Sequence, residues 1–174
     1  MVFGLHFYCD FSHFHVVYPM QEKSEYNLIS CCDDFVGLAR SFEYNVNTMQ
    51  SDHDAAASFS YEQWTSNKGI RITKSAPYTP SQNGTAESAG YRLIRRARAL
   101  RLASNLSHKL WSEIVKTAAY LENRTLTRSL EWRTFYEIIT KNTFYIEHIQ
   151  TLSSKIFFLK NNILKSLKLN SRAT

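Results

Sequence analysis

The stretch of this sequence that decides the fold reads Ala76-Pro77-Tyr78-Thr79-Pro80-Ser81-Gln82-Asn83-Gly84-Thr85-Ala86-Glu87. Its prolines, its asparagine and its glycine disfavour regular structure until Thr85 or Ala86. The residues from Glu87 to Ala103 have the spacing of a helix and carry several arginines. The stretch is therefore predicted to be a polar loop that places one carboxylate at the start of a basic helix.

A second candidate carboxylate, Asp52, lies upstream in Gln50-Ser51-Asp52-His53, after a short strand predicted at residues 45–50. A strand end and a helix start that meet at one edge of a sheet can bring two acids together. Transfer of a phosphodiester builds charge on two oxygens, which two Mg²⁺ ions about 4 Å apart can stabilise. Magnesium prefers carboxylate and water oxygens. Asp52 and Glu87 are therefore candidate metal ligands.

The remaining elements follow from apolar spacing and turn residues. Two strands are predicted at 3–8 and 15–20, with helices at 24–43, 55–67 and 107–124 and a strand at 69–73. Ser24 is the expected N-cap of the first helix. This order predicts an α/β or α+β domain. The three tryptophans (Trp64, Trp111 and Trp132) are assigned to core packing rather than to base stacking.

Composition limits the class of protein. A hydrophobic content of 44% over 174 residues suits one domain with a sizeable core. No apolar run approaches the roughly 20 residues of a membrane helix, so no membrane partner is expected. Cys9, Cys31 and Cys32 form no C-x-x-C pair, which indicates a reduced, intracellular protein. The adjacent pair is interpreted as ordinary buried packing.

Charge is distributed unevenly along the chain. The net charge of +6 combines −7 over residues 1–67, +9 over 68–133 and +4 over 134–174. An acidic part beside a basic part suits a metal site that faces a phosphate-binding surface. Phosphate contacts are predicted at helix residues Arg92, Arg95 and Arg96, with weaker candidates at Lys74, Gln82 and Asn83. A solvated helix face on an ordinary basic protein is the alternative.

Three segments carry a family resemblance. The stretch 76–87 is similar to A-P-Y-T-P-x-x-N-G-x-A-E, residues 117–124 to T-A-x-Y-L-x-N-R, and residues 133–137 to R-T-P-Y-E. On these segments the chain resembles the catalytic core of copia-type retrotransposon integrases. The resemblance implies a ribonuclease H-like fold, a mixed sheet flanked by helices, with three catalytic acids. Asp52 and Glu87, separated by 34 residues, would be the second and third of these acids.

The resemblance also implies a function. It predicts Mg²⁺ or Mn²⁺ as cofactor and DNA, both element ends and target, as partner, with RNA as an alternative. It further predicts a nuclear location if the protein functions, and a homo-oligomer. The ancestral reaction would be integration of DNA by a polynucleotidyl transferase.

The chain departs from the family in several places. Cys9-Asp10-Phe11-Ser12-His13 matches the family's D-D-x-S-R, yet none of the eight residues before it is an acid. The first strand and the first catalytic Asp are therefore predicted to be missing. His53 and Asp54 replace an expected Asn and Gly. Residues 1–140 are interpreted as a truncated core, and 141–174 as a degenerate extension of the polyprotein.

The replacements share a pattern. Expected prolines are replaced by Ser107, Leu126, Phe135 and Phe144, and expected glycines by Asp54, Lys141 and Ser153. Each change follows from C-to-T mutation on one DNA strand or the other. The hypothesis is a decayed, fungal-type transposon copy that is inactive on its own. A non-catalytic, basic nucleic-acid-binding protein and a fragment that does not fold stably are the alternatives.

Overall fold

The computed structural model describes residues 3–51, 59–74 and 84–154. The chain divides into two compact units, Met1–Phe144 and Tyr145–Thr174. Every helix and strand assigned in the described residues belongs to the first unit. The described part of the second unit consists of turns, closed by bonds such as Ile149 N–H to Ile146 O at 2.9 Å. The assignment of 1–140 and 141–174 to a core and an extension stays a prediction.

The first unit begins with a β-hairpin, as the sequence predicted. Strands β1 (Phe3–Tyr8) and β2 (His15–Met20) pair antiparallel, with Phe3 opposite Met20 and Tyr8 opposite His15. The turn between them is closed by bonds from Cys9 N–H to Phe14 O at 3.0 Å and from His13 N–H to Cys9 O at 2.7 Å.

The next elements form an α/β layer. Helix α1 (Glu25–Ser41) starts at Ser24, whose hydroxyl accepts a bond from Asn27 N–H at 3.3 Å and confirms the predicted N-cap. Strands β3 (Thr48–Ser51) and β4 (Arg71–Lys74) pair in parallel and are connected through helix α3 (Phe59–Lys68).

Helices make up most of the second half. They are α4 (Gly84–Ala103), the short 3₁₀ helix η1 (His108–Leu110), α5 (Trp111–Glu122), a second short helix η2 (Arg128–Leu130) and α6 (Phe135–Thr140). Leu93 and Ala97 of α4 are buried against Ile114 and Ala118 of α5. The helix predicted from Glu87 to Ala103 is therefore present, and it buries one face against α5.

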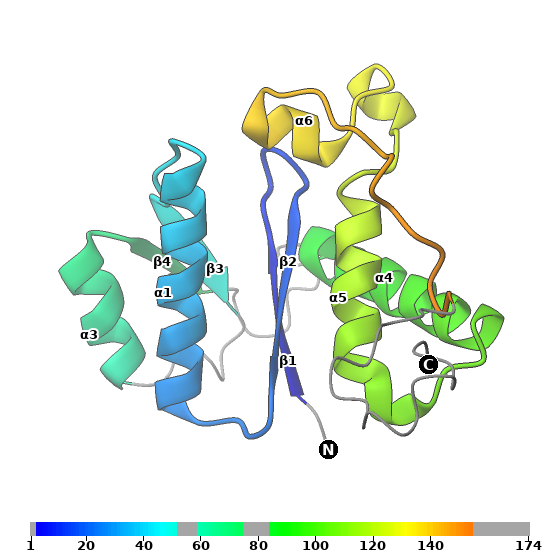
Figure 1. Cartoon of the computed structure of the whole chain (residues 1–174). Coiled ribbons are helices and arrows are strands. Elements are labelled where there is room, and N and C mark those ends of the chain that lie inside the picture. Colours follow the sequence, from blue (N-terminus) through cyan, green and yellow to red (C-terminus); the bar gives the residue numbers. More distant parts are fainter. Residues whose placement is uncertain (1–2, 52–58, 75–83, 155–174) are drawn as a thin grey trace, which may run out of the picture. The chain divides into compact units, whose positions relative to one another are not determined.

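Two hydrophobic clusters stabilise the first unit. The helices that carry them, α1 and α3 for one and α4 and α5 for the other, lie on opposite sides of the hairpin (Figure 1). One joins α1 to β3, β4 and α3 through Cys32, Val36, Met49, Tyr61, Trp64 and Ile70. The other lies between α4 and α5 and contains Leu93, Ala97, Ile114, Val115, Ala118 and Ala119. The hairpin packs against both, with Phe7 on the first cluster and Val17 on the second.

The expected mixed sheet occurs in the described residues as two separate ladders of two strands each, antiparallel β1–β2 and parallel β3–β4. Side chains connect the ladders where backbone bonds do not. Phe7 of β1 stacks on Phe35 of α1 with ring centroids 4.3 Å apart, and both pack on the cluster that contains β3 and β4. The α/β class is confirmed, while the missing first strand stays a prediction.

One of the three tryptophan assignments is wrong. Trp64 is buried and Trp111 packs on the second cluster, but the side chain of Trp132 is 64% exposed. Glu131 and Trp132 both have left-handed backbone, with φ of 55° and 62°. The tight turn between η2 and α6 therefore leaves this side chain in solvent.

None of the described helices combines the length and apolarity needed to cross a bilayer.

Candidate catalytic site and nucleic-acid interface

The two candidate acids belong to different elements in the sequence, one directly after the end of β3 and one at the start of α4. Strands β3 and β4 end together, with Ser51 opposite Lys74, and Asp52 is the next residue after β3. Glu87 lies in the first turn of α4 and is exposed. The positive end of a helix stabilises a carboxylate at this position.

Several predicted site residues lie outside the described part of the chain: Asp52, Gln82 and Asn83. Lys74 is the last residue of β4. Within the described residues, no three His, Cys, Asp or Glu side chains come close enough to hold a metal ion. The predicted magnesium site therefore still rests on the chemistry of the two carboxylates.

Two of the three predicted arginines present their side chains to solvent along α4. Arg92 is exposed and donates from Nη1 to Ser88 Oγ one turn earlier, at 3.0 Å. The exposed Arg95 places its guanidinium 5.8 Å from the ring centroid of Tyr91. Neither interaction buries the guanidinium, so both cations can meet a phosphate.

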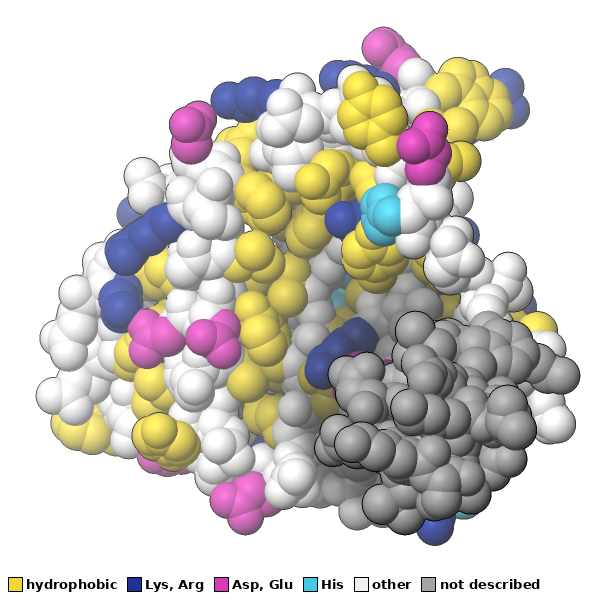
Figure 2. Space-filling model, in the orientation of Figure 1, with side chains coloured by type: hydrophobic (Ala, Val, Ile, Leu, Met, Phe, Trp, Pro, Cys, Tyr) yellow, Lys and Arg dark blue, Asp and Glu magenta, His cyan; other side chains and the backbone are white. Residues whose placement is uncertain are grey.

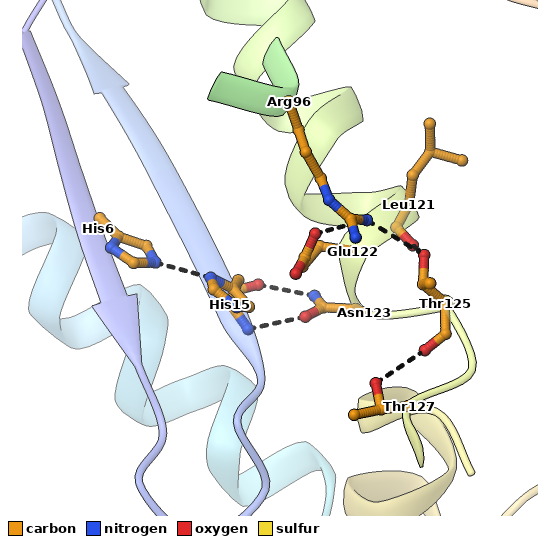
Figure 3. A network of polar contacts seen from close by, with 8 residues as sticks. All are labelled: His6, His15, Arg96, Leu121, Glu122, Asn123, Thr125 and Thr127. Carbon is orange, nitrogen blue, oxygen red and sulfur yellow. Dashed lines mark hydrogen bonds and ion pairs between the residues drawn. The ribbon is translucent and has the colours of Figure 1, made fainter. Parts of the chain in front are cut away.

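Arg96 differs from its neighbours because it pairs with a buried acid. Its Nη1 lies 2.6 Å from Oε2 of Glu122, a side chain on α5 that is only 9% exposed (Figure 3). The same Nη1 donates to Thr125 Oγ1 at 3.4 Å. A buried carboxylate that loses its cation is strongly destabilised. Arg96 therefore holds α4 to α5, and a phosphate would have to compete with Glu122.

The structure adds two residues of α4 that sequence reasoning missed. The ring of Tyr91 is 64% exposed, and Arg98 is exposed as well. Glu87, Tyr91 and Arg95 are spaced by four, so they follow one face of the helix. That spacing was available in the sequence. An exposed ring beside arginines can stack on a nucleic-acid base.

A buried polar network anchors the hairpin to α5 (Figure 3). The side chain of Asn123 accepts from His15 N–H at 2.8 Å and donates to His15 O at 2.7 Å. His6 Nε2 and His15 Nδ1 share a hydrogen bond of 3.0 Å. Asn123 thus satisfies the backbone of β2 as a neighbouring strand would.

Both histidines of this network are held neutral. Burial lowers the pKa of His6, and it lowers the pKa of His15 to about 3 with help from the charges of His6, Arg92 and Arg96. Imidazoles of this kind serve the fold rather than proton transfer at neutral pH.

Of the adjacent cysteines in α1, Cys32 is buried as predicted, whereas Cys31 is half-buried. Burial raises the pKa of the Cys32 thiol to about 12 and also raises the pKa of Cys31. Because the thiolate is the reactive form, neither thiol is activated.

Comparison with known proteins identifies the architecture. No family model matches the sequence. Over 97 residues, 56% of this chain, the sequence is 29% identical to the retrovirus-related Pol polyprotein from transposon TNT 1-94 of Nicotiana tabacum. The matched part is 7% of that polyprotein, so the chain spans only a small fraction of this relative.

Solved structures agree on the fold. The catalytic core domain of BIV integrase superposes with a TM-score of 0.59 and 17% identity, over 80% of this chain and 93% of that one. The fold is that of an integrase catalytic core. A chain of the simian T-cell lymphotropic virus intasome, solved with the PP2A regulatory subunit B56 gamma, gives a TM-score of 0.63 and 16% identity, over 99% of this chain and 64% of that one.

The integrase-core fold and the similarity to a Pol polyprotein together confirm the resemblance to copia-type elements. The chain thus has the fold of an integrase catalytic core and is similar in sequence to part of a retrotransposon Pol polyprotein. Its fungal-type origin and its decay stay predictions.

Proposed function

We propose that this integrase-core fragment binds nucleic acid through α4, with DNA as the partner and RNA as the alternative. The observation that carries the proposal is the exposed arginine face of α4 behind Glu87, formed by Arg92, Arg95 and Arg98. Guanidinium groups bind phosphates and position a duplex without reading its sequence. We therefore assign this face to the backbone of the bound nucleic acid.

The ancestral chemistry follows from the two carboxylates. Asp52 and Glu87 would hold Mg²⁺ or Mn²⁺, which when bound stabilises charge on the attacking and leaving oxygens of a phosphodiester. Arg92 and Arg95 would hold the DNA backbone, while the first turn of α4 fixes the position of Glu87. This division of roles suits the processing of DNA ends and their transfer into a target.

Two carboxylates would hold the metal weakly, so the chain alone is expected to lack joining activity. A joining assay in Mg²⁺ or Mn²⁺ tests this expectation. Activity that Glu87→Gln abolishes would overturn it. For the full ancestral polyprotein we propose a nuclear location and a homo-oligomer.

The binding proposal is tested by fluorescence anisotropy with a labelled DNA duplex over a range of salt. Arg95→Gln should weaken binding and reduce the slope of log affinity against log salt by about 0.9, the contribution of one phosphate contact. Arg40→Gln, in the last turn of α1, makes the same charge change on another helix and is the matched control. Equal effects of the two variants would show that binding reflects net charge rather than α4.

The non-catalytic alternative makes a separate prediction. Binding to DNA or RNA that persists in a metal chelator, together with absent joining activity, would identify a basic nucleic-acid-binding protein. Binding that requires metal would favour a retained metal site.

We also propose that the chain is a decayed element copy, and two backbone positions support this. Lys141 and Ser153, which stand where the family suggests glycine, have φ of 58° and 67°. Glycine adopts this left-handed region at no steric cost, whereas other residues are strained there.

The replaced prolines are consistent with the same history. Phe135 is the first residue of α6, the position in a helix that best accepts proline. Ser107 has a φ of −60°, which matches the fixed φ of proline. The coding DNA tests the proposal: an excess of C-to-T changes at synonymous positions supports decay. Equal frequencies of all transitions there would refute it.

A further inference from the structure

A groove of about 690 Å³ crosses the first unit where the hairpin turn, the end of α1 and α6 meet. Its lining includes Phe11, Tyr44, Arg133, Glu137, Lys141 and Asn142, and no residue of α4. Figure 2 shows hydrophobic side chains at the surface in this part of the molecule, with Lys and Arg side chains near them. The groove is therefore a surface separate from the arginine face of α4.

Aromatic rings form one wall of the groove. The side chain of Phe11 is 71% exposed at the tip of the hairpin. Its ring centroid lies 6.4 Å from that of Tyr44, and the two planes are inclined by 46°. The rings therefore do not cover each other, and the face of Phe11 stays open to a planar ligand.

Two cations accompany the rings. The Nζ of Lys141 lies 5.8 Å from the centroid of Tyr44, and Arg133 is exposed, with Nε donating to Leu130 O at 3.4 Å. These contacts place positive charge beside the aromatic wall. The exposed acids Asp10 and Glu43 neighbour the two rings in the sequence but do not line the groove.

The acid that does line the groove is already engaged. Oε2 of Glu137 accepts bonds from Thr134 N–H at 2.9 Å and from Thr134 Oγ1 at 3.1 Å, which complete the capping box of α6. These bonds also lower the pKa of Glu137, so it stays ionised and bound to the helix start. A ligand with phosphate groups would thus meet two cations and one carboxylate, of which Oε2 is bonded to the start of α6.

We propose that this groove binds one or two nucleotides of single-stranded nucleic acid. A base stacks on Phe11 beside Tyr44, and the adjoining phosphates lie near Arg133 and Lys141. A duplex keeps its bases stacked on each other and offers no free face to Phe11, so the groove selects unpaired strands. This second surface goes beyond the proposed role of α4 and depends on different residues.

The test compares Phe11→Ala with Phe11→Tyr, using anisotropy of a labelled single-stranded oligodeoxythymidine and of a duplex. Phe11→Ala should weaken single-strand binding about tenfold and leave duplex binding unchanged, whereas Phe11→Tyr, which keeps a ring, should bind like the parent. Tyr26→Ala removes another exposed ring, 81% exposed on α1, and is the matched control.

Two results would overturn the proposal. The first is unchanged single-strand binding in Phe11→Ala. The second comes from competition: if an acidic peptide displaces the labelled oligonucleotide at a lower concentration than unlabelled oligonucleotide does, the partner is a protein. Arg95→Gln should weaken duplex binding, so failure of the α4 surface is distinguished from failure of the groove. Unchanged thermal unfolding shows that the variants are folded.

Discussion

At the scale of single residues, His15 makes the stability of the fold depend on pH. Its side chain is buried, and its Nε2 has no hydrogen-bond partner among the described residues. The folded pKa is lowered from 6.5 to about 3, so between these values the unfolded chain binds a proton that the folded chain does not. The contribution of neutral His15 to the free energy of unfolding is fully present above pH 6.5 and is lost as the pH falls toward 3.

We therefore expect the free energy of unfolding, measured in urea, to fall by up to about 1.4 kcal/mol per pH unit from this group across that window. His15→Phe keeps a ring beside Phe135 and cannot titrate, so it should remove this part of the slope. A slope that survives in His15→Phe would assign the effect to other groups.

Arg96 provides a second prediction at this scale, because it alone of the three predicted arginines pairs with a buried carboxylate. Arg96→Gln should lower the free energy of unfolding by about 1–3 kcal/mol. This is less than the loss for a fully buried ion pair, because the arginine itself is half-exposed to solvent. Arg92→Gln should change it by less than about 0.5 kcal/mol.

A double-mutant cycle with Glu122→Gln checks the assignment by urea unfolding. The double variant should recover part of the loss, because the buried negative charge is then gone. Additive losses would mean that the two side chains do not stabilise each other.

At the scale of elements, several ends carry residues that strain the backbone. Lys141 follows α6 with left-handed φ, a position where helices commonly place glycine. Lys141→Gly should raise the free energy of unfolding by about 1 kcal/mol.

Lys141→Ala removes the same charge and side chain but keeps the Cβ atom, so it separates the two causes. It should give none of this gain. Thermal and urea unfolding of both variants measure the difference, and an equal gain in Lys141→Ala would assign it to charge instead of conformation.

The same scale shows which features a sequence can predict. The first helix, its cap at Ser24 and the arginine-bearing helix from Glu87 to Ala103 follow from local signals. The pairing of Arg96 with Glu122 joins residues on two helices, so spacing within α4 could not separate Arg96 from Arg92. The exposure of Trp132 depends on backbone angles that its neighbours in sequence do not specify.

At the scale of the molecule, the hairpin couples the two hydrophobic clusters of the first unit. Phe7 packs on one cluster and Val17 on the other. The class of fold was predictable from the order of strands and helices. The division of the strands into two ladders was not, because it depends on which strands meet through space.

This coupling predicts a single unfolding transition. Ile114→Ala removes buried volume from the cluster between α4 and α5 and should cost about 2–5 kcal/mol. Trp64 belongs to the other cluster. In Ile114→Ala, the urea midpoint measured by Trp64 fluorescence should nevertheless fall by the same amount as the midpoint measured by far-UV circular dichroism.

The experiment uses a background of Trp111→Phe and Trp132→Phe, so that Trp64 is the remaining indole. An unchanged Trp64 midpoint in Ile114→Ala would show that the two clusters unfold independently.

The buried thiol of Cys32 gives a direct measure of how often α1 leaves its hydrophobic cluster. A cysteine that is 2% exposed and holds its proton tightly can react with iodoacetamide only while α1 is detached from its cluster. The half-buried Cys31, next to it in the same helix, should be alkylated sooner and serves as an internal reference. The ratio of the two alkylation rates, read by mass spectrometry, reports the fraction of time that α1 spends released. A large ratio would show that α1 stays packed on its cluster, and a ratio near unity would show a chain that cannot keep its first helix in place.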